Sequence, residues 1–199
     1  MKPLLAHAVC ALLLLCACDS PVNDERIECL GGEQPEVPPS EFHRPGQPCV
    51  TCHGEYAADS PILAVGGTIM STPFNPVPVE GVLVRLTDAQ ATVIEKTTNC
   101  IGNFQVTADE WTPAFPLRAE IECPTGDEDK PIRRFVMGTR ITRDGSCGGC
   151  HIGPPSQYSP GWIYCAESEA AGSPYVVSDA CPGVPYGLPA KKCPEDFLF

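Results

Sequence analysis

The sequence predicts a mainly β protein, in which a small antiparallel sandwich of residues 61–124 lies between irregular segments. Short β-prone runs follow one another within this stretch, and turn residues separate them, as in antiparallel sandwiches. No segment shows helical periodicity over more than two turns. Proline and glycine are abundant, at 23 and 18 of 199 residues, and both interrupt regular elements. These observations favour short strands over long helices.

Each expected strand follows from a local pattern. Residues 65–70 are β-prone and contain two glycines, and residues 82–86 alternate partly between apolar and polar, as a half-buried strand does. Further runs follow at short spacing. The expected strands of the sandwich cover residues 65–70, 82–86, 91–98, 103–107 and 115–121, and another β-prone run covers 132–142.

The pattern Cys-x-x-Cys-His occurs twice, once on each side of the predicted sandwich. At this composition about 0.02 matches are expected by chance. The pattern is the attachment signature of c-type haem: its two thiols add to the haem vinyl groups, and its histidine binds the iron. We therefore expect two covalently attached haem c groups. The residues that would hold them are Cys49, Cys52 and His53 in the first motif and Cys147, Cys150 and His151 in the second.

A low-spin haem iron needs a second axial ligand, normally methionine or histidine. Besides the motif histidines, an exported chain would contain only His43, and its methionines would be Met70 and Met137. Because Cys49 follows His43 and Cys147 follows Met137 at short distance, each motif has one candidate ligand before it. The alternatives are a surface histidine in a proline turn and, for Met137, a core residue. Met70 ends a predicted strand and fits the core better. At most one haem can therefore have two histidine ligands from this chain.

The N-terminal residues have the pattern of an export signal, with one lysine and then a mostly apolar stretch too short to span a bilayer with ease. The signal would cover residues 1–17, and Cys18 resembles the lipidated cysteine of the bacterial lipobox. We expect a lipoprotein of the bacterial cell envelope, in the periplasm or at the cell surface. The remaining expected segments are an acidic, proline-rich tether (18–40), a first haem-binding segment (41–60), a second one (125–165) and a C-terminal tail (166–199).

Six cysteines remain when the lipidation site and the motif cysteines of the exported chain are set aside. An even number in an oxidising compartment predicts three disulfides, with fifteen possible pairings. Our specific expectation is a bond between Cys100 and Cys123, inside the sandwich, while the other pairings stay open. The six candidates are Cys29, Cys100, Cys123, Cys165, Cys181 and Cys193.

Three stretches of the sandwich carry a family resemblance. They are Gly67-Thr68-Ile69, residues 79–88 (Val-Glu-Gly-Val-Leu-Val-Arg-Leu-Thr-Asp) and residues 98–104 (Thr-Asn-Cys-Ile-Gly-Asn-Phe). This part of the chain resembles the carboxypeptidase regulatory-like, or transthyretin-like, β-sandwich family. The resemblance implies an immunoglobulin- or transthyretin-like sandwich that acts as a structural or binding module, with no catalytic residues. Cys100 departs from the family, whose turn usually has a small polar residue there.

The leading interpretation is an envelope-anchored dihaem cytochrome that transfers electrons between redox partners. The net charge of −12 argues against nucleic acid as a partner and favours a protein with a basic docking face. One alternative is a peroxidase-like haem enzyme with one five-coordinate iron. Another is a non-redox, disulfide-rich binding lipoprotein. A zinc site made by the four motif cysteines is a further alternative, but it leaves both motif histidines without a role.

Overall fold

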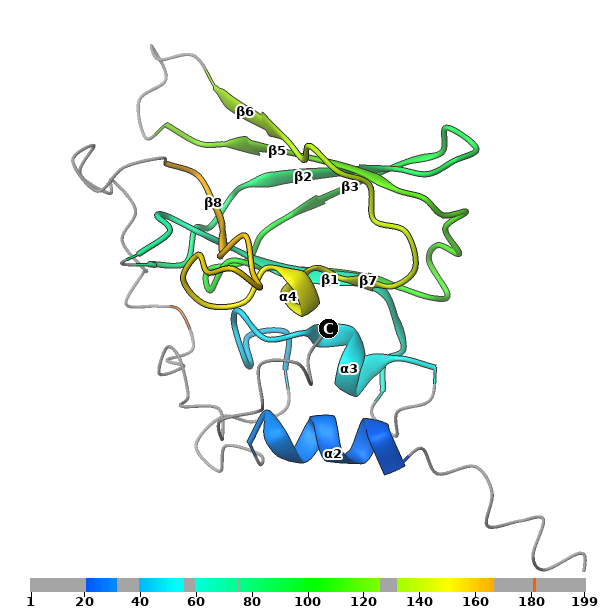
Figure 1. Ribbon diagram of the computed structural model, residues 1–199. Helices are drawn as coiled ribbons and strands as arrows, with labels where there is room; N and C mark the ends of the chain where they lie inside the picture. The colour runs from blue at the N-terminus through cyan, green and yellow to red at the C-terminus, as the bar shows by residue number, and fades with distance from the viewer. Residues whose placement is uncertain are drawn as a thin grey trace, which may run out of the picture.

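Two β-sheets face each other and form the body of the protein, which is mainly β as the sequence predicts (Figure 1). The computed structural model describes residues 21–31, 40–55, 60–74, 76–125, 132–166 and 181. The expected signal, Cys18, Cys193 and most of the expected tail lie outside these residues. Within the described ranges, the helices are all too short or too polar to cross a membrane.

The second sheet is antiparallel throughout and has the strand order β3-β2-β5-β6. Burial alternates along β2, where Val84 and Leu86 point between the sheets. Strand β5 begins later than predicted because Pro116 cannot donate a hydrogen bond to a sheet. The strands are β2 (Leu83–Thr87), β3 (Val93–Thr97), β5 (Arg118–Cys123) and β6 (Arg133–Val136).

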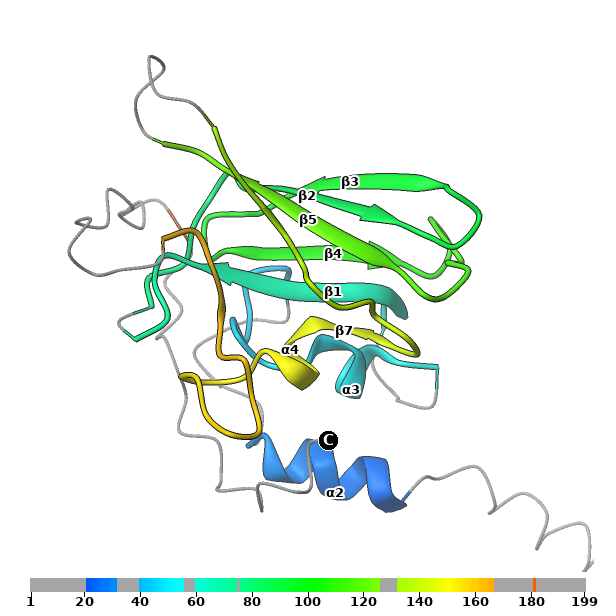
Figure 2. The ribbon, with the colours of Figure 1, turned by 45° about the horizontal axis from the view of Figure 1, so that its top comes forward.

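The first sheet is built around β1 (Leu63–Met70), which pairs with β4 (Asn103–Thr107) in antiparallel orientation. Two short strands, β7 (Gly145–Ser146) and β8 (Ile163–Tyr164), run parallel to β1 beside successive parts of it. Nearly all of β1 is buried, on both faces. The inner face packs against the second sheet, α3 (Cys49–His53) lies against the outer face, and α4 (Cys147–Cys150) lies beside β1 where β7 ends (Figure 2).

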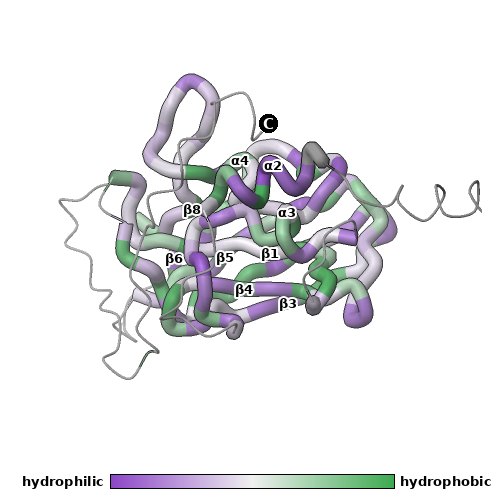
Figure 3. Tube along the Cα trace, turned by 90° about the horizontal axis from the view of Figure 1, so that it is seen from below, coloured by the Kyte–Doolittle hydropathy of each residue, from purple (hydrophilic) through white to green (hydrophobic). Residues whose placement is uncertain are grey.

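The sheets continue past residue 124, where the sequence analysis placed the end of the sandwich. Strand β6 lies in the predicted β-prone run of residues 132–142, whereas β7 and β8 come from parts of the chain that were expected to be irregular. Three helices complete the described structure: α2 (Pro21–Cys29), α3 (Cys49–His53) and α4 (Cys147–Cys150). Helix α2, mostly hydrophilic (Figure 3), lies within the expected tether and packs on α3.

Two disulfides hold the later segments to the sandwich. Cys123 at the end of β5 is bonded to Cys165, directly after β8, and Cys100 is bonded to Cys181. The expected Cys100–Cys123 bond is therefore wrong. Both cysteines do lie in the sandwich, but each binds a cysteine far along the chain. Cys29 is disulfide-bonded as well.

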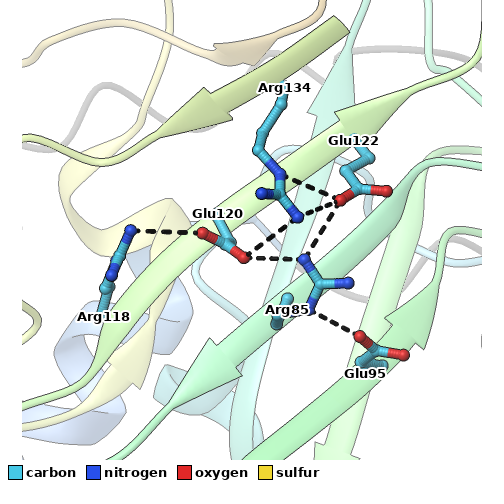
Figure 4. A network of polar contacts seen from close by, with 6 residues as sticks. All are labelled: Arg85, Glu95, Arg118, Glu120, Glu122 and Arg134. Carbon is cyan, nitrogen blue, oxygen red and sulfur yellow. Dashed lines mark hydrogen bonds and ion pairs between the residues drawn. The ribbon is translucent and has the colours of Figure 1, made fainter. Parts of the chain in front are cut away.

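A network of ion pairs covers the outer face of the second sheet (Figure 4). Arg85 on β2 binds the carboxylates of Glu120 and Glu122 on β5, at 2.7 and 3.1 Å, and that of Glu95 on β3 at 2.6 Å. Arg134 on β6 also binds Glu122. Because opposite charges face each other across neighbouring strands, the network supports the register of this sheet.

Candidate functional site

The first Cys-x-x-Cys-His motif forms α3 and lies against the outer face of β1. A Cβ atom on Gly66 of β1 would come within 2.9 Å of Cβ and 3.2 Å of Sγ of Cys49. Only glycine permits so close an approach. Cys49 is therefore seated directly on the strand, and burial raises the pKa of its thiol to about 11.

The second motif is placed by the same strand. Strand β7 pairs with β1 through Gly66 and Ser146, and α4 begins at the next residue, Cys147. A Cβ atom on Gly67 would lie 2.7 Å from Cβ of Cys147. Burial raises the pKa of the Cys147 thiol to about 12. Two consecutive glycines of β1 are therefore in close contact with the first cysteines of the two motifs.

The two motifs also contact each other. A Cβ atom on Gly148 in α4 would lie 2.5 Å from the carbonyl oxygen of Gln47 and 2.9 Å from the nitrogen of Pro48. These two residues immediately precede α3. Gln47 and Gly148, 101 positions apart in the sequence (148 − 47), therefore meet backbone to backbone.

In all three described histidines, Nδ1 contacts a backbone carbonyl oxygen. Nδ1 of His53 lies 3.0 Å from the carbonyl oxygen of Pro61, and Nδ1 of His151 lies 2.8 Å from that of Gly161. Nδ1 of His43 contacts the carbonyl oxygen of Ser40. A carbonyl can only accept, so Nδ1 carries the proton and Nε2 keeps its lone pair. Metal-binding histidines are commonly oriented in this way.

His43 lies beside the first motif. It lines a cavity of about 280 Å³ together with Cys49, Cys52 and His53. The ring centres of His43 and His53 are 5.7 Å apart. Metal-to-imidazole bonds of about 2 Å would place the centres of two rings on either side of one metal ion roughly 6 Å apart. The distance between the two ring centres is therefore close to that of two histidine ligands on one iron.

Hydrogen bonds from the sandwich hold the His43 segment in place. Nδ2 of Asn103, at the start of β4, donates to the carbonyl oxygen of His43 at 2.9 Å. The nitrogen of Gly46 donates to Oγ1 of Thr68 on β1 at 2.7 Å, and Thr68 in turn donates to Asn103. Strands β1 and β4 thus position the candidate ligand as well as the motif.

The second motif opens onto a larger cavity, of about 820 Å³. Cys147, Cys150 and His151 line it on one side, and Met137 lines it too. Its other walls include core residues of both sheets, among them Ile69, Leu86, Phe104 and Ile121. A mainly apolar cavity of this size is typical of cofactor sites.

Met70 lines neither of these two cavities and is 4% exposed, as expected for a core residue. His151 is partly buried, and burial lowers its pKa, which favours the neutral imidazole. Ser159, also buried, fixes the loop after the motif: its Oγ lies 2.9 Å from the carbonyl oxygen of Cys150. The ring of His151 is therefore held by the loop that follows it.

The four motif cysteines are all free thiols. In the part of the chain that the structure describes, no three histidine, cysteine or carboxylate side chains converge as a metal-binding group. A haem iron needs fewer protein ligands than such a group provides, because the protein supplies only its two axial ligands.

Sequence reasoning named the motif residues, His43 and Met137. The structure places His43 beside His53, and Met137 lines the same cavity as the second motif. It missed the glycine pair of β1, whose only signal was two glycines inside a strand pattern. It also missed Phe104, which lines both cavities. Trp162 and Tyr164, which their positions after the second motif had marked as aromatic residues able to line a haem edge, line the second cavity.

No protein-family model matches the chain, and neither curated proteins nor solved structures show significant similarity to it.

Proposed function

We propose that this protein is a dihaem c-type cytochrome that transfers electrons between redox partners. The observation that carries the proposal is the shared arrangement of the histidines: each motif histidine donates Nδ1–H to a backbone carbonyl and keeps Nε2 for a ligand bond. Each motif also lines a cavity that contains one further candidate ligand, His43 or Met137. When bound, each haem supplies a one-electron couple at its iron.

At each site, cysteines would anchor the haem and two other side chains would bind its iron. Cys49 and Cys52 would anchor the first haem, and His53 and His43 would bind its iron. Cys147 and Cys150 would anchor the second, with His151 and Met137 as iron ligands. The apolar walls of the second cavity would exclude water, which favours the less charged, reduced state.

The second haem would lie partly between the two sheets, because the second cavity is lined by core residues of both. This differs from the simplest expectation of a sandwich with haems on its flanks. We also propose that the sandwich is of the immunoglobulin or transthyretin type. The alternation of buried residues and the antiparallel second sheet support this assignment.

The remaining proposals concern location and partners. Disulfides are typical of exported proteins, and the described part of the chain contains the bonds Cys100–Cys181 and Cys123–Cys165. We propose an envelope lipoprotein anchored through Cys18. Its net charge of −12 would favour partners with a basic docking face.

The test is to express the full chain in a host that makes c-type cytochromes, and to record the mass and the pyridine haemochrome spectrum of the mature protein. Two haems per chain are expected. Cys52→Ser should remove or weaken one haem and Cys150→Ser the other, because each loses one thioether bond. A folded, colourless protein of unmodified mass would contradict the proposal and favour the binding lipoprotein.

A further inference from the structure

Trp162 connects the loops of the two motifs. It belongs to the loop between α4 and β8 and lines the second cavity together with His151. Its ring lies against Gly46, in the segment that leads from His43 to α3: a Cβ atom on Gly46 would come within 2.5 Å of Cζ3 and 3.0 Å of Cη2 of the indole. The two loops lie side by side in Figures 1 and 2. A side chain of the second site therefore packs on the segment that carries the candidate ligand of the first.

The backbone around Trp162 also orients a histidine. Gly161, directly before it, provides the carbonyl oxygen that lies 2.8 Å from Nδ1 of His151. The nitrogen of Trp162 donates to the carbonyl oxygen of Gly153 at 3.0 Å, and β8, which begins at the next residue, pairs with β1. The indole is therefore held in place by the same loop that orients His151.

Gly46 is enclosed on two sides. It is buried, adopts a φ of +78°, and donates its N–H to Thr68 on β1. The three atoms nearest to a Cβ on Gly46 belong to Trp162 and Met70. Protein interiors are densely packed, so a large aromatic ring restricts the movement of a segment that it covers. Without the indole, the segment after His43 would keep its hydrogen bonds to the sandwich but would have empty space beside it.

We infer that Trp162 is a positioning residue for the first haem: its ring holds residues 43–48 in the conformation in which His43 binds the first iron. The inference rests on the proposed function, in which His43 and His53 are the two ligands of that iron. Because Trp162 belongs to the loop of the second motif, the second site then helps to complete the ligand set of the first. A role confined to the second cavity would instead affect the second haem alone.

The first test records the electron paramagnetic resonance and visible spectra of the oxidised holoprotein. His43→Ala identifies the low-spin signal of the first haem as the signal that it removes. Trp162→Leu should lose most of the same signal and gain high-spin ferric iron. Added imidazole should restore the low-spin form, because it can occupy the ligand position that His43 leaves. Trp111→Leu is the matched control: it makes the same substitution in the sandwich core, and Trp111 lines neither described cavity. It should lower the melting temperature and keep the signal.

A second pair of variants tests the contact without removing a side chain. Gly46→Ala brings a Cβ atom into the ring of Trp162, whereas Gly81→Ala introduces a Cβ at the same φ of +78° with no atom within 4 Å of it. Gly46→Ala should therefore weaken the low-spin signal of the first haem, and Gly81→Ala should not. In the Trp162→Leu background, Gly46→Ala should have a smaller further effect, because residues in contact are not independent.

Three results would overturn the inference and leave the dihaem proposal standing. The first is a change confined to the second haem in Trp162→Leu, or a low-spin form that imidazole does not restore. The second is an equal effect of Gly46→Ala and Gly81→Ala. The third is a His43→Ala protein that keeps both low-spin signals, because His43 is then not a ligand. If wild type carries no haem, the proposed function fails first.

Discussion

Met70 and Met137 lie in different environments, and the proposed function makes Met137 the candidate iron ligand. Met70 is buried in the core beside Gly46, whereas Met137 lines the second cavity with His151. We predict that the oxidised protein shows a far-red sulfur-to-iron band, which Met137→Leu abolishes. Met70→Leu is the control, since leucine has nearly the volume of methionine and should leave the band in place.

A band that survives in Met137→Leu would exclude Met137 as the ligand. If wild type has no such band and electron paramagnetic resonance shows high-spin ferric iron, the second site is open. The peroxidase-like alternative would then be favoured.

Arg85 lowers the pKa of two carboxyl groups of the second sheet, those of Glu120 and Glu122. Its hydrogen bond lowers the pKa of Glu120, and Arg134 and Arg85 together lower that of Glu122. A lowered folded pKa adds stability above the unfolded pKa of about 4.3, which is lost as the pH falls through the folded value. Arg85→Gln should therefore be less stable than wild type at neutral pH, and this difference should shrink in acid.

Denaturant unfolding at a series of pH values measures this effect. Arg118→Gln is the matched control, because Arg118 is half exposed and reaches only Glu120, at 3.5 Å. It should have little effect at any pH. An Arg85→Gln difference that stays constant down to the acid range would show that the network does not stabilise the sheet.

At the scale of elements, the contact between α4 and the residues before α3 depends on one glycine. A Cβ atom on Gly148 would lie 2.5 Å from the oxygen of Gln47, whereas one on Gly149 would lie 3.6 Å from Cβ of Ser146, an ordinary contact. Gly148→Ala should cost about 1–3 kcal/mol and lower the haem content of both sites. Gly149→Ala should be neutral or slightly stabilising. Equal effects in thermal unfolding would contradict the packing of the two motifs.

The Cys123–Cys165 bond fixes β8 against the sandwich, and β8 forms part of the wall of the second cavity. Replacing both cysteines with alanine should lower the free energy of unfolding by about 2–5 kcal/mol. It should disturb the spectrum of the second haem more than that of the first. The double variant of Cys100 and Cys181 is the control, since Cys100 lines neither described cavity. Peptide mapping without reduction should show both pairs, and a Cys100–Cys123 peptide would contradict them.

At the scale of the whole molecule, the two sites differ in cavity volume and in their candidate ligands. One is a smaller cavity with two histidines, and the other is a larger, core-lined cavity with histidine and methionine. Burial and methionine ligation both raise a haem potential. We predict two resolved reduction steps, the higher one belonging to the second haem. A redox titration that shows one step, with identical spectra for both haems, would contradict this.

The sequence alone predicted strands β1 to β6, the two motifs and one candidate ligand for each, because these depend on local patterns: alternation, a five-residue signature and short spacing. The sequence did not predict the contacts between segments that lie far apart along the chain. The partners of Cys100 and Cys123, the pairing of β7 and β8 with β1, and the contact of Gly148 with Gln47 depend on how the chain returns to one strand. The second cavity exists only in the folded chain, because its walls come from α2, both sheets and the loops around α4. No local pattern carries that information, since the free energy that selects such contacts comes from burial between segments remote in sequence.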